Sequence, residues 1–352
     1  MNKLIYSLLL LFLATSSASA ATPDSALIVS RLAGMIKDRL TFHAYGQAGY
    51  TYEKNNGVET NTFDLKRVVV FTQAKVTEQW SFMFMYNFGN NTIQEFYTDF
   101  APINGLTIRV GQFKTPLSIE NPLAPTDLEL VNLNAQSVAY LTGIFSDPLY
   151  GNNAGRDIGV MLHGDLFDKM FHYEVAVMNG QGINQRDSNN TKDIVAKIGL
   201  RPTSWLHISA SGQKGHGHAV GVSTFNPEIQ EGDNYRRDRL TAGCEVCQMP
   251  LFNLRAEYLA GRDRNVKSQG AYATACVPLL VRKTDLHNTL DLILSADYFN
   301  RNKSADMWQT NFIVGLQYWY YKFCRVQAQY VRCAPNNAPD YNSLQMQVQV
   351  AF

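Results

Sequence analysis

The stretch RVGQFKTPLSIENP, residues 109–122, places basic side chains at the end of a predicted strand. Alternate residues of a strand point to opposite faces, so Arg109 lies opposite the apolar Val110, on a polar face. Pro116 has no backbone N–H, which ends strand pairing just after Lys114. A guanidinium group is a planar fork of donors that matches phosphate oxygens. This motif therefore has the chemistry of an anion-binding or anion-conducting surface.

Acidic side chains follow within the same connection, residues 114–150, which has no regular pattern and a length typical of functional or disordered loops. Glu120, Asp127, Glu129 and Asp147 outnumber the single Lys114. A pore that is strongly specific for anions should concentrate positive potential at its narrowest point. These carboxylates therefore argue against strict phosphate selectivity.

Period-two alternation of apolar and polar residues predicts the elements that hold this motif. In the last segment, NSLQMQVQVAF, apolar residues alternate with Gln. This pattern is typical of a strand whose two faces lie in different environments. About 16 such segments are predicted, a number typical of bacterial barrels. They are residues 42–50, 62–76, 80–90, 93–101, 106–113, 155–165, 171–178, 194–201, 205–213, 240–248, 251–261, 271–281, 288–299, 308–320, 322–332 and 342–352.

The side chains on the two faces favour a transmembrane barrel over a soluble sandwich, which also alternates. The apolar faces carry aromatic residues near strand ends, as an interfacial girdle would. These are Tyr50, Tyr52, Phe100, Tyr298, Tyr318, Tyr320 and Tyr330. The other faces carry charged and amide side chains that a sandwich core could not bury unpaired. We predict an all-β fold, a closed antiparallel transmembrane β-barrel.

The N-terminal region predicts export. Residues 1–20 have a basic tip, a short apolar run and an Ala-x-Ala site, which indicates a cleaved signal peptide and delivery to the outer membrane of a Gram-negative bacterium. Residues 21–40 are predicted to contain a short amphipathic helix, and residues 41–352 to form the barrel. Without Lys3, basic and acidic residues are equal in number, so we expect no nucleic-acid partner.

Strand parity predicts which charges face the lumen. A barrel of about 16 strands leaves an aqueous channel, and the charges that line it set its selectivity. The basic candidates for pore lining and anion binding are Arg109, Lys114, Lys197, Arg201, Arg255 and Arg325. The acidic ones on strands are Asp99, Asp157, Glu174, Glu245, Glu257, Asp291 and Asp297. Each of them could instead be a wall residue paired across strands.

Residues 109–120 resemble the RxGQFKxPFSLE signature of the phosphate-selective porin O and P family. Further matches are Arg67 after Phe63, Arg156–Val160, and Asn179–Gly182. The motif residues that we single out are Gly111, Phe113, Pro116, Arg156 and Asp157. The resemblance covers about residues 40–200. It implies a trimeric outer-membrane barrel of 16 strands whose third extracellular loop, expected at 114–150, folds inward to narrow the pore.

We therefore predict a porin for passive diffusion of small hydrophilic solutes, including anions such as phosphate, in contact with outer-membrane lipid. The alternatives are a surface-structural or adhesin-type barrel with a plugged lumen, and an outer-membrane lipid hydrolase. No motif assembles a Ser–His–acid triad, so we predict no enzyme activity. His216 and His218 lie in a second predicted irregular segment, 214–238, and Arg236, Arg237 and Arg239 are predicted to lie in loops. Without further ligands nearby, we expect no metal and no cofactor.

Overall fold

The computed structural model describes residues 39–132, 134–145, 147–249, 251–280 and 288–352. The predicted signal peptide and nearly all of the predicted helical segment 21–40 lie outside these residues. None of the described helices is long and apolar enough to cross a membrane.

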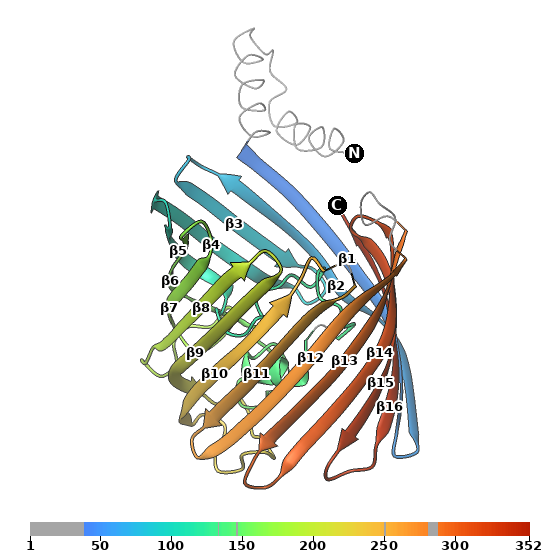
Figure 1. The fold of residues 1–352 in the computed structure, drawn as a ribbon. Helices are drawn as coiled ribbons and strands as arrows, with labels where there is room; N and C mark the ends of the chain where they lie inside the picture. Colours follow the sequence, from blue (N-terminus) through green and yellow to red (C-terminus); the bar gives the residue numbers. More distant parts are fainter. Residues whose placement is uncertain (1–38, 133, 146, 250, 281–287) are drawn as a thin grey trace, which may run out of the picture.

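Sixteen antiparallel strands close into one barrel, in which each strand pairs with its sequence neighbours and β1 pairs with β16 (Figure 1). Their bounds are β1 Leu40–Asn55, β2 Val58–Lys75, β3 Trp80–Asn87, β4 Thr92–Ile103, β5 Leu106–Lys114, β6 Arg156–Leu166, β7 Phe171–Met178, β8 Asp193–Thr203, β9 Leu206–His218, β10 Asn234–Val246, β11 Asn253–Asp263, β12 Val266–Leu280, β13 Thr289–Asn302, β14 Met307–Tyr321, β15 Cys324–Pro335 and β16 Tyr341–Ala351. The predicted fold class is confirmed.

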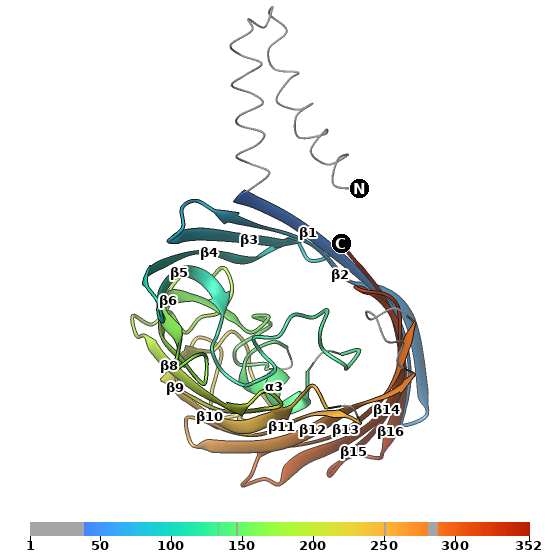
Figure 2. The same ribbon diagram turned by 45° about the horizontal axis from the view of Figure 1, so that its top comes forward.

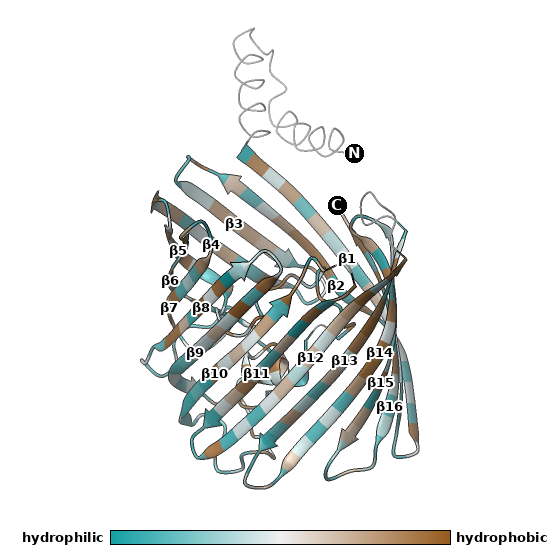
Figure 3. Cartoon of the chain, in the orientation of Figure 1, coloured by the Kyte–Doolittle hydropathy of each residue, from teal (hydrophilic) through white to brown (hydrophobic). Residues whose placement is uncertain are grey.

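The alternation along the strands separates an apolar outer face from a polar inner face. On β16, Val348 and Val350 are exposed on the outside, whereas Gln347 and Gln349 are buried inside. Figure 3 shows the same alternation as bands along the strands. This pattern suits lipid on one side and a polar lumen on the other, and closure gives every strand two hydrogen-bonded neighbours.

The long connections, residues 115–155, 179–192 and 219–233, join β5 to β6, β7 to β8 and β9 to β10 at the barrel end opposite the start of β1. The predicted irregular segment 214–238 is too long, because β9 continues through His218 and β10 begins at Asn234. The prediction that Arg236, Arg237 and Arg239 lie in a loop is therefore wrong. In the ends of β9 and β10, glycines and inward-facing arginines break the alternation of apolar residues, but the two strands remain paired.

The connection 115–155, which we call the inward loop, lies inside the barrel and contains the helix α3, Gln136–Leu141 (Figure 2). Val138, Tyr140 and Leu141 pack in one cluster with barrel residues that include Leu259 and Phe299. The largest apolar cluster therefore lies in the lumen, between the inward loop and the inner face of β11 to β13, and a second cluster packs Leu117 of the loop against β5 to β8.

Candidate functional site

The motif at residues 109–122 spans the end of β5 and the beginning of the inward loop. Gly111 has φ +135, and an added Cβ would lie 2.2 Å from the carbonyl oxygen of Phe96, so only glycine fits between β4 and β6. Phe113 is fully buried beneath the loop. Asn121 closes the loop base, because its Nδ2 donates to the carbonyl oxygens of Thr115 at 2.8 Å and Gly155 at 3.0 Å.

Lys197, predicted to line the pore, holds this first turn in place. Its Nζ donates to the carbonyl oxygen of Ser118 at 3.0 Å, and its side chain is buried. The Ser118 hydroxyl donates to the Glu257 carboxylate at 2.7 Å, and the Ile119 amide donates to the same carboxylate at 3.1 Å. Lys197 and Glu257 therefore both anchor the loop.

Arg255, on β11, forms ion pairs with acidic residues of the inward loop and of the neighbouring strand β10. Its guanidinium lies 2.9 Å from Glu129, 3.0 Å from Glu245 and 3.8 Å from Glu120. Burial raises the pKa of Glu120 to about 8. Arg255 lowers this pKa, but its effect is smaller than that of burial, and Glu129 and Glu245 lie closer to its guanidinium. Asp127 is exposed. Two of the four predicted acidic loop residues, Glu120 and Glu129, thus face the wall at Arg255.

Two further predicted basic residues, Arg325 and Arg201, also have partners. Arg325 is buried and donates to the carbonyl oxygen of Leu128 at 2.8 Å and to Gln317 at 2.7 Å. Arg201 is exposed and lies 3.6 Å from Asp165, at the barrel end where β6 turns into β7. Neither arginine lines the two cavities described below.

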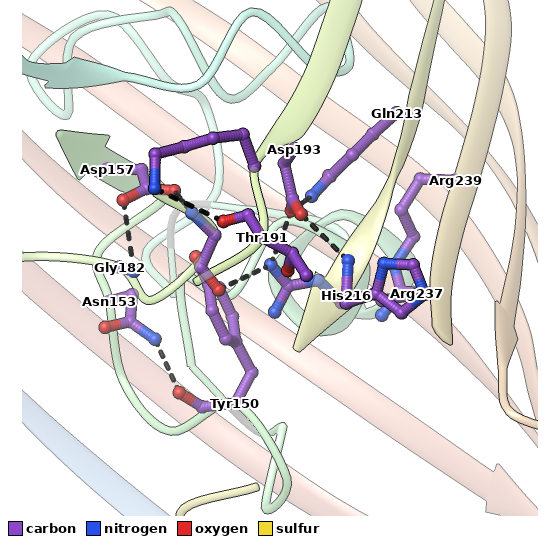
Figure 4. A network of polar contacts seen from close by, with 12 residues as sticks. Tyr150, Asn153, Asp157, Gly182, Thr191, Asp193, Gln213, His216, Arg237 and Arg239 are labelled. Atoms are coloured by element: carbon purple, nitrogen blue, oxygen red, sulfur yellow. Dashed lines mark hydrogen bonds and ion pairs between the residues drawn. The ribbon is translucent and has the colours of Figure 1, made fainter. Parts of the chain in front are cut away.

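A buried polar network fixes the far end of the inward loop (Figure 4). Arg237 donates to Asp193 at 2.9 Å and to the carbonyl oxygen of Gly180 at 3.0 Å, and it lies 3.8 Å from the centre of the Tyr150 ring. Arg239 forms an ion pair with Asp263 at 3.0 Å. These arginines pin the loop to the wall and are not surface attractors for anions.

Asp157 of the family motif organises the neighbouring connection 179–192. Its carboxylate accepts the amides of Gly180 at 2.6 Å and Gly182 at 3.3 Å. Both glycines have positive φ, which side chains rarely adopt. The adjacent Arg156 donates to Glu95 at 2.7 Å. The two neighbouring motif residues thus have different roles: Asp157 holds a loop, and Arg156 lines the open lumen.

Two cavities remain open between the inward loop and the wall from β1 to β6. The outer cavity, of about 180 Å³, lies toward the loop end of the barrel, where residues such as Asn90 and Asn152 line it. The inner cavity, of about 440 Å³, reaches Phe352 at the chain terminus. The residues common to both linings are Tyr45, Lys114, Pro125 and Arg156. Because the two cavities share these residues, we take them as the neck of one passage through the barrel, which we call the open passage.

Basic residues dominate the outer cavity. Gln47 pairs with Arg67 and Ala48 with Leu65, so Lys66 is the extra residue of a β-bulge. A bulge re-aims side chains, and Lys66 and Arg67, although adjacent, both line this cavity. The other charged residues in its lining are Lys114 and Arg156, and its described lining holds no carboxylate.

The partners of these basic groups differ along the passage. Arg67 donates to the Gln47 side-chain oxygen at 2.9 Å, and Lys114 donates to the carbonyl oxygen of Leu123. Deeper in, Arg109 forms two hydrogen bonds of 2.8 Å with Asp99. In these contacts Arg67 and Lys114 bind neutral oxygens, whereas Arg109 binds a carboxylate.

The comparisons with known proteins agree with this architecture. Residues 42–211 match the model of the family described as phosphate-selective porin O and P. This match covers just under half of the chain and includes the motif at residues 109–122. A comparison with curated proteins gives no match. The family and the closed barrel make the protein a porin of the Gram-negative outer membrane.

Solved structures similar to the porin share its fold at low identity. The anion-selective porin from Comamonas acidovorans is 12% identical with a TM-score of 0.66, covering 89% of this chain and 99% of that chain. OprB of Pseudomonas putida is 9% identical with a TM-score of 0.65, covering 92% and 97%. The DcaP channel of Acinetobacter baumannii is 11% identical with a TM-score of 0.59, covering 89% and 97%.

Sequence reasoning missed Lys66, which is half-buried in the lining of the outer cavity. Lys66 was not singled out, because parity would place it opposite Arg67. Of the predicted basic residues, the structure brings Arg109 and Lys114 to the open passage together with the motif residue Arg156. The signal that could have found Lys66 is the KR pair at 66–67, which places two basic residues side by side within a predicted strand.

Proposed function

We propose that the porin conducts small anions by passive diffusion through the open passage. The observation that carries this proposal is the outer cavity, whose charged lining residues are Lys66, Arg67, Lys114 and Arg156. Positive potential in a narrow, low-dielectric cleft concentrates anions and excludes cations. The anion-selective porin from Comamonas acidovorans has the same fold, which supports the proposal by analogy.

The spacing of charges along the passage suits conduction rather than tight binding. An anion that leaves Arg67 meets Lys114 and Arg156 at the neck and Arg109 beyond it. A series of modest sites lets an ion enter and leave. The loop carboxylates Glu120 and Glu129 do not oppose this path, because they pair with Arg255 on the other side of the lumen. Phosphate is therefore among the anions that we propose to pass.

Planar-bilayer recording tests this proposal. The purified porin should give ohmic conductance, and the reversal potential in asymmetric KCl should show a preference for chloride over potassium. Added phosphate should reduce chloride current by competing for the same basic groups. Cation selectivity would refute the anion channel. An absence of conductance would favour a sealed surface barrel or an enzyme, the two readings that the channel proposal excludes.

We also propose that the porin functions as a homotrimer. The similar barrel OmpT of Vibrio cholerae is described in a trimer form, at 13% identity and a TM-score of 0.59. Mass measurement in detergent tests this proposal: a mass of three chains is expected after subtraction of bound detergent, and a single-chain mass would contradict it.

A further inference from the structure

The inner cavity of the open passage differs in chemistry from the outer one. Its wall carries the side chains of Phe71, Met83, Met85 and Tyr97, which lie on neighbouring strands β2, β3 and β4. Register places Phe71 opposite Met85, and Met83 opposite Tyr97, so the four side chains form one continuous patch. We call it the apolar patch.

The inward loop completes an apolar slot opposite this patch. Pro116, Pro122 and Pro125 line the same cavity from the loop side. Proline rings present carbon and no backbone N–H, so this side of the slot offers no amide donors at these positions. A solute in the inner cavity is therefore held between aromatic and thioether side chains on one side and proline rings on the other.

The charged groups next to the slot are mostly compensated within the protein. Arg156 is bound to Glu95 at 2.7 Å, Glu174 contacts His172 at 2.9 Å, and Arg109 is bound to Asp99. Lys114 at the neck is the cation whose contact is a neutral carbonyl oxygen. The inner cavity thus combines one available positive charge at its entrance with a large apolar surface.

A small hydrated inorganic anion gains little from the apolar surface, because it has no apolar area to remove from water. An organic anion gains from both parts. Its carboxylate meets Lys114, and its hydrocarbon body displaces water from the apolar patch. Methionine side chains are flexible and adapt to bodies of different shape.

We propose that the preferred solutes are organic carboxylates with an aromatic or aliphatic body, which bind with the carboxylate at Lys114 and the body against the apolar patch. This inference rests on the proposed anion channel and specifies its solute class. Inorganic phosphate is then a permeant ion but not the best-bound one.

The test compares three probes in planar bilayers: benzoate, acetate and inorganic phosphate, each titrated against the chloride current of the full porin. We expect half-maximal inhibition by benzoate at a concentration at least tenfold below that of acetate and of phosphate. Equal potency of benzoate and acetate in a channel that still prefers anions would overturn the solute class alone. A cation-selective channel would overturn the underlying channel proposal as well.

Variants tie the effect to the apolar patch. The double substitution Met83→Gln and Met85→Gln keeps side-chain length and should abolish the benzoate advantage, while the chloride-to-potassium preference stays within twofold. Met249→Gln, in the turn after β10, is the matched control and should behave like the wild type. If the double variant fails to fold, as judged by heat-dependent gel mobility, Phe71→Ser replaces it. A benzoate advantage that survives in the folded variants would refute the proposed site.

Discussion

The two sides of the lumen use the same residue types for different purposes. Toward β8 to β15, Arg237, Arg255 and Arg325 are bound to carboxylates or loop carbonyls and hold the inward loop against the wall. Toward β1 to β6, Arg67 and Lys114 contact neutral oxygens and face the open passage. The position of a charge relative to the loop therefore decides its role, and the overall balance of lumen charge does not.

This contrast follows from solvation. A charge that the loop covers loses water, and it is tolerated only with partners that replace the lost interactions. A charge beside an aqueous passage keeps water as a partner and can exchange it for a passing ion. The loop covers one side only, so the molecule separates anchoring charges from conducting ones within a single barrel.

The largest effect is expected from removing an anchoring charge. Arg237→Ala leaves Asp193 buried without its guanidinium partner, so we expect a loss of about 3–5 kcal/mol in the free energy of unfolding. Arg236→Ala, at the neighbouring exposed position, removes a surface pair and should cost about 0–1 kcal/mol. Denaturant unfolding in detergent micelles measures both. Equal losses would mean that the Arg237 network does not stabilise the barrel.

A second test uses the pH dependence of the covered side. Burial raises the pKa of Glu120 to about 8, so the folded porin binds a proton that the unfolded chain releases near the ordinary value of 4.5. The free energy of unfolding should therefore be highest below the ordinary pKa and fall as pH rises toward the folded pKa. We expect a fall of a few kcal/mol across this range, since each pKa unit between 4.5 and about 8 corresponds to about 1.4 kcal/mol.

Glu120→Gln should remove most of this pH dependence, because the amide stays neutral and Arg255 retains Glu129 and Glu245. Glu228→Gln, an exposed glutamate in the connection 219–233, is the control and should leave the profile unchanged. Urea unfolding at about pH 5 and about pH 9 provides the comparison. A wild-type profile in Glu120→Gln would show that Glu120 is already ionised in the folded porin.

The strands were predictable because lipid and lumen impose opposite demands on successive residues. All sixteen predicted segments overlap the observed strands, and the missed strand residues include 214–218 of β9 and 234–239 of β10, where glycines and inward arginines break the apolar alternation. The family motif also located the start of the inward loop, which begins after Lys114. The connection ends at residue 155, five residues beyond the predicted end.

The division of charges was not predictable from the same rules. Parity assigns Lys197, Arg255 and Arg325 to the lumen, and they lie there, but it carries no information on which lumen residues the loop covers. Which residues the loop covers depends on the path of residues 115–155, and their sequence has no periodic pattern from which that path could be predicted. Parity also fails at Lys66, because a bulge shifts the register by one residue.

The open side is tested by charge substitution at the neck. Lys114→Glu replaces a positive with a negative charge where both cavities meet, and the anion-to-cation permeability ratio should fall at least tenfold. The matched pair Lys114→Gln and Lys197→Gln applies one substitution to both sides of the lumen. Reversal potentials should show a severalfold fall for the first and less than a twofold change for the second. A larger effect at Lys197 would contradict the comparison.

The smallest effect is expected at Arg109, which lines the inner cavity but is paired. Its two hydrogen bonds to Asp99 make the pair nearly neutral to a passing ion, so Arg109→Gln should change the permeability ratio by about twofold or less. Asp99→Asn should raise anion preference by releasing the guanidinium. In the Asp99→Asn background, Arg109→Gln should then have a clearly larger effect than in the wild type, because the charge it removes is no longer compensated. Equal effects of Arg109→Gln in both backgrounds would mean that pairing does not decide how much a lumen charge contributes to selectivity.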